Sequence, residues 1–185
     1  MSATTLKLAL GGPDRPEWQQ TVMTAYYGGQ RWAVAVDGHR LHAERWDVEG
    51  PAFPYDLGAL IACARGEVEV DVSGALTRAR KWLRPTRRLV VRLSNGLVFQ
   101  PPFYPAKPKE QEAKTPARLR AEFAALGPLF ALGTWGAAQA IDLRYLSEAV
   151  RHVGTTIVEA SRLDELAPVL LRGETRLAII MPVRQ

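Results

Sequence analysis

The chain has 185 residues, of which 47% are hydrophobic and 23% are charged. A chain of this length and composition can bury a core, which excludes a disordered tail. Its apolar runs are too short for a membrane-spanning helix. The single cysteine, Cys63, excludes an internal disulfide framework and a cysteine-built zinc site. The N-terminus has neither a basic start nor a long apolar stretch, so we expect a cytoplasmic protein with no membrane partner.

The positive charge of the chain is concentrated in one region. Lysine and arginine number 24 against 19 aspartates and glutamates, which gives a net charge of +5. Residues 72–109 contain nine basic residues and no acidic residue. A basic block on a mildly acidic body predicts contact with a polyanion, although a solvated helix face would have the same composition. Arginine greatly outnumbers lysine and Asn95 is the one asparagine, which favours a thermophilic source.

The N-terminal region is predicted to form a strand, a helix and a hairpin. Loose alternation of apolar residues over 4–10 predicts the first strand. Asp14 can cap a helix over 16–26, where Trp18 and Val22 fall on one stripe. Alternation over 31–36 and 39–46, on either side of the Asp37-Gly38 turn, predicts a β-hairpin.

The middle of the chain reads as strand, helix and hairpin. Residues 57–65 are apolar and fit a helical turn or a buried strand. Strict alternation over 67–72 predicts a strand, followed by a helix from Ser73 or Gly74 to Arg84. Residues 87–93 and 97–100 flank an Asn-Gly turn and predict a second hairpin.

The C-terminal region begins with a proline-rich linker over 101–116 and a helix over 117–132. A short strand at 139–141 precedes a helix over 143–152, which Asp142 caps and Gly154 ends. Three further strands are predicted, at 155–159, 168–172 and 176–181.

These elements contain an internal repeat. Residues 67–100 and 139–183 each read as a strand, a capped helix and further strands, and the region up to residue 46 reads as an eroded third copy. Because one βαββ unit cannot bury its sheet alone, the units must pack as neighbours. We therefore predict an α+β fold with mainly antiparallel sheets and helices on one face. The predicted divisions are a domain at 1–102, a linker at 103–118 and a half-domain at 119–185.

Three segments resemble one protein family. Residues 33–41, AVAVDGHRL, are similar to the VATDGHRLA segment of the bacterial replicative sliding clamp, the beta subunit of DNA polymerase III. The terminal LAIIMPVRQ at 177–185 is similar to that family's YVVMPMRL, and residues 141–146 resemble its FNVSYLLD. The segments occur in the family's order, which implies DNA-clamp-like repeats of βαββ units.

The resemblance implies a peptide-binding pocket. In the clamp family the first two motifs form the walls of one pocket, which receives a short peptide with glutamine and apolar or aromatic anchors. Replicative polymerases and repair proteins carry such clamp-binding peptides. A flexible methionine, a rigid proline and branched aliphatic residues suit an apolar slot. The implied pocket residues are Gly38, His39, Arg40, Leu41, Ile179, Ile180, Met181, Pro182, Val183 and Arg184.

Without the resemblance, these two motifs have simpler readings. Residues 37–40 would be a tight hairpin in which His39 and Arg40 face solvent. Residues 179–184 would be a buried last strand, with Ile179 in the core in either case.

The resemblance also implies contact with double-stranded DNA. In the family, domain helices line a central hole and touch phosphates without reading bases, and such contacts weaken steeply with salt. On the predicted helix that ends at Arg84, basic side chains face away from an apolar stripe. The implied DNA contacts are Arg78, Arg80, Lys81, Arg84, Arg87, Arg88, Arg144 and Arg151.

The implied function is that of a non-catalytic processivity factor without a cofactor, which tethers a partner to DNA. Clamp subunits have three similar domains and close into a ring, and this chain is too short for that arrangement. Encircling DNA would therefore require a homo-oligomer. The alternative is a monomeric adaptor or decoy that binds the same peptides.

A metal-dependent nucleic-acid enzyme is a further alternative. Glu67, Glu69 and Asp71 alternate on one predicted strand, so their carboxylates point to one side and could hold Mg²⁺. The wet face of an amphipathic strand has the same pattern. No P-loop, dinucleotide fingerprint or nucleophile elbow is present, and the apolar neighbours of Cys63 predict a core residue.

Overall fold

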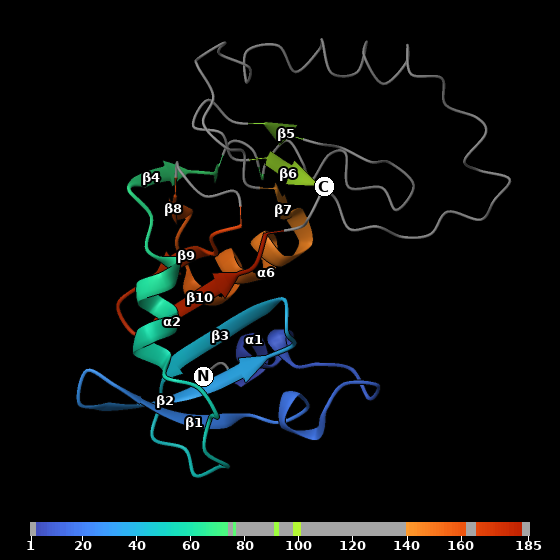
Figure 1. Ribbon diagram of the computed structural model, residues 1–185, viewed down its shortest axis with the longest axis vertical. Coiled ribbons are helices and arrows are strands. Elements are labelled where there is room, and N and C mark those ends of the chain that lie inside the picture. The colour runs from blue at the N-terminus through green and yellow to red at the C-terminus, as the bar shows by residue number, and fades with distance from the viewer. Residues whose placement is uncertain are drawn as a thin grey trace, which may run out of the picture.

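The computed structural model describes residues 3–73, 76, 91–92, 98–100, 140–161 and 166–182. Most of the described strands form one antiparallel sheet in the order β1-β2-β3-β10-β9-β8-β4 (Figure 1). Its strands are β1 (Met23–Tyr27), β2 (Gln30–Val36), β3 (Arg40–Arg45), β4 (Val68–Asp71), β8 (Ile157–Ala160), β9 (Val169–Arg172) and β10 (Arg176–Ile180).

A smaller sheet holds β5 (Val91–Arg92), β6 (Val98–Gln100) and β7 (Ala140–Asp142). The antiparallel pairing of β5 with β6 confirms the predicted second hairpin, while β7 runs parallel to β6. The predicted α+β class with mainly antiparallel sheets is therefore confirmed. The larger sheet takes strands from both ends of the chain, because β10 pairs with β3 and β8 pairs with β4.

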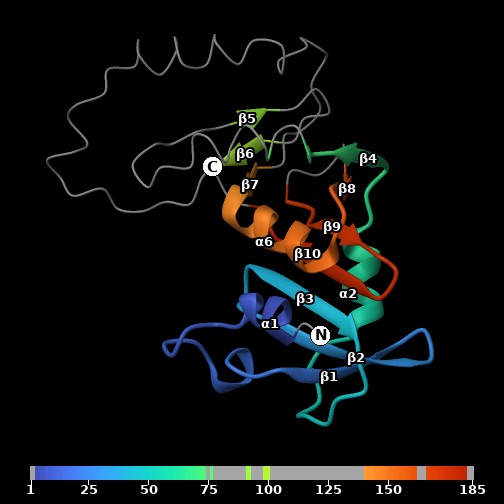
Figure 2. The same ribbon diagram turned by 180° about the vertical axis from the view of Figure 1, so that it is seen from behind.

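The helices lie on both faces of the larger sheet, whereas the sequence predicted one. Side chains of β10 alternate: Leu177 and Ile179 pack in the same cluster as α2 (Leu57–Ala64), and Ala178 and Ile180 in the same cluster as α6 (Leu143–Val153). Helix α2 lies in front of the sheet in Figure 1, and α6 lies in front of it in Figure 2. Both faces of β10 are apolar, so both require a covering helix.

The first predicted elements are wrong. Residues 4–10 form the end of a short helix α1 (Ala3–Leu6) and a 3₁₀ turn η1 (Lys7–Ala9) instead of a strand. Leu6 and Ala9 are buried against Ala33 and Ala35 of β2, whose small side chains allow this close approach. The spacing of three residues between Leu6 and Ala9 is helical, and it outweighs the loose alternation.

The predicted helix over 16–26 is also wrong. The chain forms a 3₁₀ turn η2 (Glu17–Gln19) and then β1, in which Met23 and Ala25 are buried on one side. The region up to residue 46 is therefore not a third copy of the repeat.

Helix α2 settles the ambiguity over residues 57–65. Asp56 caps it, accepting hydrogen bonds from the backbone N–H groups of Gly58 at 2.8 Å and Ala59 at 3.3 Å. Leu57, Ile61 and Ala64 are its buried residues. Cys63 lies on the other side of the helix and is exposed, so its prediction as a core residue is wrong.

Helix α6 and the strands after it confirm the sequence prediction. The Asp142 carboxylate accepts a hydrogen bond from the Arg144 backbone at 2.7 Å, and Gly154 ends the helix at φ +81°. The predicted strand at 67–72 is confirmed as β4. The greater part of the helix predicted to end at Arg84, the linker at 103–118 and the helix at 117–132 lie outside the described residues, and the division into domains stays a prediction. No helix among the described residues is long and apolar enough to cross a membrane.

Two stacked histidines form a polar contact inside the fold. The rings of His42 on β3 and His152 on α6 lie 4.6 Å apart and nearly parallel, and both side chains are fully buried. His42 Nδ1 lies 3.1 Å from the Thr5 carbonyl, and His152 Nδ1 lies 3.2 Å from the Thr5 hydroxyl. Burial lowers the pKa of His42 to about 3 and also lowers the pKa of His152. Both imidazoles are therefore neutral, and they connect α1, β3 and α6.

Candidate peptide-binding site

The last strand lies directly beside the Asp37-Gly38 turn. In the antiparallel register of β10 and β3, Ile180 faces Arg40 and Ile179 faces Leu41. The Met181 N–H extends the pairing and donates to the His39 carbonyl at 2.8 Å. The two motifs that the sequence places 140 residues apart are thus neighbours in one sheet.

Asp37 shapes the turn. One of its carboxylate oxygens accepts hydrogen bonds from the backbone N–H groups of His39 at 2.9 Å and Arg40 at 3.0 Å. Gly38 has φ +89°, in the left-handed region that glycine reaches without strain. Gly38 and His39 are consequently held at the surface.

Arg40 points into the protein, not toward a ligand. Its side chain is 8% exposed, and its guanidinium bonds to the carboxylates of Asp37 and Glu148 and to the Leu8 carbonyl. Its charge also lies 4.4 Å from the centre of the Tyr145 ring. Burial lowers the pKa of Arg40, and Asp37 opposes that shift. Arg40 therefore fixes the turn against η1 and α6.

The remaining predicted pocket residues divide by burial. Leu41, Ile179 and Ile180 are buried in the core. Met181 is 42% exposed and Pro182 is half-buried, while Val183 and Arg184 lie outside the described residues. We call the exposed remainder the turn–tail surface; it consists of Gly38, His39, Met181 and Pro182.

Helix α6 borders the turn–tail surface. The ring of Tyr145, in its first turn, stacks on His39 with centres 6.2 Å apart. Arg15 also reaches the turn, with a guanidinium nitrogen 3.2 Å from His39 Nε2. Sequence reasoning assigned neither Tyr145 nor Arg15 to this site: Tyr145 lies in the 141–146 segment and Arg15 lies in no motif, and only the folded chain brings them to the turn.

Two of the predicted DNA contacts lie on α6. Arg144 and Arg151 are both exposed and are seven residues apart, which places them on one side of the helix. The Arg144 guanidinium lies 4.9 Å from the centre of the Tyr145 ring. The other six predicted contacts, from Arg78 to Arg88, lie outside the described residues.

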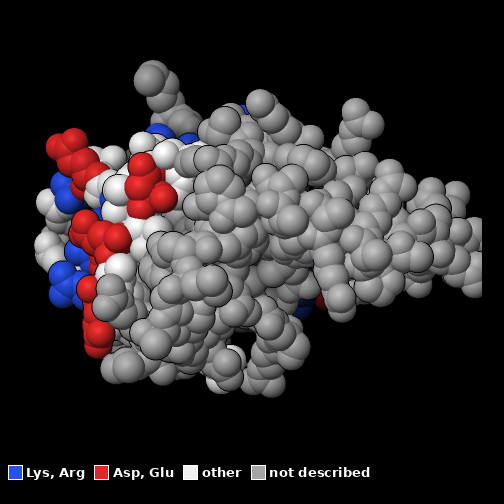
Figure 3. Space-filling view, turned by 90° about the horizontal axis from the view of Figure 1, so that it is seen from above, with Lys and Arg blue, Asp and Glu red and all other residues white. Residues whose placement is uncertain are grey.

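The three acidic residues predicted on one strand face solvent at β4 and just before it. Glu67, Glu69 and Asp71 are exposed, and Asp71 accepts hydrogen bonds from the backbone and hydroxyl of Ser73 at 2.9 and 3.1 Å. Figure 3 views the end of the molecule that carries β4 and β8, and its described part shows acidic side chains with basic ones beside them. No group of three potential ligands that could hold a metal ion occurs among the described residues. The carboxylates therefore behave as a solvated strand face.

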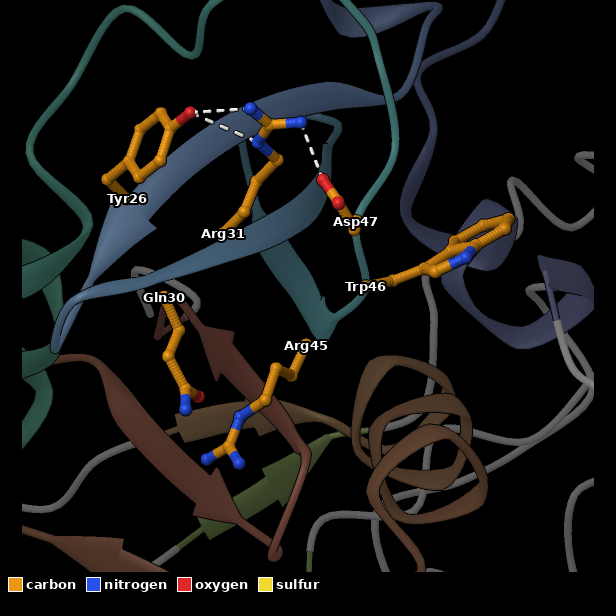
Figure 4. A pocket seen from close by; sticks show the side chains of 6 residues that line it. All are labelled: Tyr26, Gln30, Arg31, Arg45, Trp46 and Asp47. Atoms are coloured by element: carbon orange, nitrogen blue, oxygen red, sulfur yellow. Dashed lines mark hydrogen bonds and ion pairs between the residues drawn. The ribbon is translucent and has the colours of Figure 1, made fainter.

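Two surface pockets lie at the other end of the sheet, around the tip of the β1–β2 hairpin. One has a volume of about 410 Å³ and is lined by Tyr26, Gln30, Arg31, Arg45, Trp46 and Asp47 (Figure 4). The second has a volume of about 520 Å³, lies between β1 and residues 48–57, and shares Tyr26 and Arg31 with the first. The sequence analysis assigned no function to these residues.

Among solved structures, the chain is similar to the DNA polymerase sliding clamp from Bacillus subtilis, with a TM-score of 0.55 and 16% sequence identity. The match covers 98% of this chain and 60% of that chain. A DNA polymerase sliding clamp from Pseudomonas aeruginosa also aligns, at 15% identity and a TM-score of 0.42, over 98% of this chain and 62% of that one. No protein-family profile and no curated protein sequence matches the chain.

The fold is therefore that of the sliding clamps. This chain is a sliding-clamp-like protein in architecture, and it spans 60% of the length of the B. subtilis clamp.

Proposed function

We propose that this protein is a shortened, non-catalytic sliding-clamp-like protein that tethers a polymerase or repair protein to double-stranded DNA. The pairing of β10 with β3 carries this proposal, because it brings the Asp-Gly-His-Arg turn and the Met-Pro tail together at one end of these two strands. The clamp-like fold supports it. The partner binds through a short linear peptide and the DNA through its phosphates.

Exposure and burial suggest a separate role for each residue of the proposed peptide site. Met181 and His39 contact the peptide, because both are exposed on the turn–tail surface. Leu41, Ile179 and Ile180 are buried in the strands that carry this surface, and Arg40 positions the turn. An apolar anchor on Met181 and Pro182 buries little area, so we expect an affinity in the micromolar range.

A labelled peptide with glutamine and apolar anchors tests the site. Met181→Lys should weaken its binding at least tenfold in fluorescence anisotropy, because a charge replaces the exposed thioether. Ile157→Lys is the matched control, since Ile157 is 39% exposed on the distant strand β8 and faces Asp71 across the β4–β8 pair. Equal affinities of the two variants would refute the proposed peptide site.

DNA contact is tested separately. Replacing both Arg144 and Arg151 with alanine should weaken duplex binding and make the slope of log affinity against log salt about 1 to 2 units shallower. An unchanged slope would exclude α6 from the DNA contact. Sedimentation velocity then distinguishes the two forms of the proposal: a closed homo-oligomer can encircle DNA, whereas a monomer corresponds to the adaptor or decoy.

A further inference from the structure

The larger of the two surface pockets has the features of a ligand site. We call it the tyrosine groove; it lies between β1 and the segment that leads into α2. Tyr26 and Tyr55 are 66% and 57% exposed, and both line it. Its other principal lining residues are Thr24, Glu49, Phe53 and Asp56.

Both tyrosine rings are held in place although they are exposed. The Tyr26 hydroxyl accepts hydrogen bonds from Arg31 Nε at 3.0 Å and Nη2 at 2.8 Å, and Arg31 in turn pairs with Asp47 (Figure 4). The Tyr55 ring meets Trp18 and Phe53 edge-on, with ring centres 6.0 and 5.6 Å apart. A ligand would therefore meet ordered aromatic surfaces. The two tyrosine side chains would lose little additional conformational entropy when it binds.

The charges in the groove favour a cation. The carboxylates of Glu49 and Asp56 are exposed at its wall. The one basic residue among its lining residues is Arg31, whose charge is balanced by Asp47. A Lys or Arg side chain is attracted both to carboxylates and to the faces of tyrosine rings.

The backbone beside the groove is suited to an extended chain. On the outer edge of β1, the Thr24 N–H donates to the Pro51 carbonyl and the Thr24 carbonyl accepts from the Phe53 N–H, both at 2.8 Å. This parallel pairing joins Thr24 to the segment around Ala52, and among the described residues it does not continue past Phe53. Tyr26 directs its backbone groups to the same edge as Thr24, two residues on, and among the described residues no backbone partner meets them there.

We propose that the tyrosine groove binds an extended, basic segment of a partner protein, which pairs with the backbone of Tyr26 and places a Lys or Arg side chain between Tyr26 and Tyr55. Glu49 and Asp56 neutralise that side chain. The segment extends along β1 the backbone pairing that residues 51–53 begin. This is the geometry of strand addition. This site is separate from the turn–tail surface and adds a second partner contact.

A fluorescein-labelled ten-residue peptide of alternating Lys and Thr is the probe, titrated against the full chain in fluorescence anisotropy. We expect saturable binding that a peptide of alternating Glu and Thr does not show. Tyr55→Ala and the pair Glu49→Gln with Asp56→Asn should each weaken it at least fivefold. Asparagine also caps helices, so the charge is removed without loss of the α2 cap.

Trp46→Ala is the matched control, because Trp46 is 46% exposed but lies outside the tyrosine groove. It should leave the affinity within twofold of the wild type. A peptide methylated on its backbone nitrogens should bind at least fivefold more weakly, because it cannot donate to the Tyr26 carbonyl. The proposal is overturned if the Lys-Thr peptide does not saturate, if Tyr55→Ala binds it as the wild type does, or if backbone methylation has no effect.

Discussion

The two faces of strand β3 are stabilised in different ways, whereas its neighbour β10 presents apolar residues to both. On the α2 face, β3 and β10 present Leu41, Ala43, Leu177 and Ile179, which all belong to one apolar cluster. On the α6 face, the same strand β3 presents Arg40, His42 and Glu44, which are paired with groups on α1, η1, α6 and β10.

The two faces therefore contribute differently to the fold. Apolar packing contributes stability, whereas the polar contacts determine where the turn lies. Apolar packing is non-directional, and it tolerates small shifts between α2 and the sheet. Hydrogen bonds and ion pairs require one geometry, so the α6 face fixes where the Asp-Gly turn lies relative to α6. Arg40 on this second face holds the Asp-Gly turn of the turn–tail surface, so the position of that turn depends on polar contacts.

The largest effect is expected from breaking the charged centre of the α6 face. Arg40→Met leaves the carboxylates of Asp37 and Glu148 without their cation, and the free energy of unfolding in urea should fall by about 3–4 kcal/mol. Adding Glu148→Gln to Arg40→Met should recover part of the lost free energy of unfolding, because one of the two unpaired carboxylates is removed. A loss below about 1 kcal/mol would show that the ion pairs do not stabilise the turn.

The α2 face should lose less. Leu170 on β9 is fully buried in the cluster that contains α2. Leu170→Ala leaves a cavity and should lower the free energy of unfolding by about 2–3 kcal/mol. The loss should be the same at pH 7.5 and pH 5.0, because no titrating group belongs to that cluster. A loss that grows in acid would contradict the contrast between the faces.

Local sequence signals predicted several parts of the fold correctly, among them the β2–β3 hairpin and strand β4. The unit from β7 to β10 was found because Asp142 and Gly154 mark the ends of its helix and its strands alternate clearly. The segment over 4–26 failed because its structure is set by contacts with β2, which no local pattern shows. Trp18 and Val22 fit a helical stripe. The residues after them nevertheless form strand β1, because they pair with β2.

The candidate site was predictable in its location and not in its detail. The resemblance to the clamp family predicts that the Asp-Gly turn and the C-terminal motif lie together. The β3–β10 register confirms that contact. The alternation of polar and apolar residues over β3 is typical of a strand with one wet face, but α1 and α6 cover that face. The burial of Arg40 and His42 therefore required the tertiary structure.

The stacked histidines predict an acid-sensitive α6 face. His42 is neutral when folded because burial lowers its pKa to about 3, whereas an unfolded histidine titrates near pH 6.5. The unfolded chain therefore binds more protons between these values, and stability present at pH 7.5 is lost as the pH falls below about 6.5. At pH 5.0 the loss from His42 should be about 1–2 kcal/mol, and the lowered pKa of His152 acts in the same direction.

Urea unfolding at pH 7.5 and 5.0 measures this loss. His42→Gln and, separately, His152→Gln should each flatten the pH dependence, whatever their cost at pH 7.5. Leu170→Ala is the control, because it destabilises without changing the slope. A slope that persists in both histidine variants would place the acid sensitivity elsewhere.

The smallest effect is expected at the outer end of the same face. Glu44 accepts two hydrogen bonds from the Arg176 guanidinium, at 2.9 and 2.7 Å, and this pair is partly shielded from solvent. Glu44→Gln keeps an acceptor oxygen and loses the charge, so the free energy of unfolding should fall by about 1 kcal/mol. Asp47→Asn removes the charge from the Arg31–Asp47 pair, in which Asp47 is 82% exposed, and should cause no measurable change. Equal losses in the two variants would mean that burial does not strengthen the polar contacts of the α6 face.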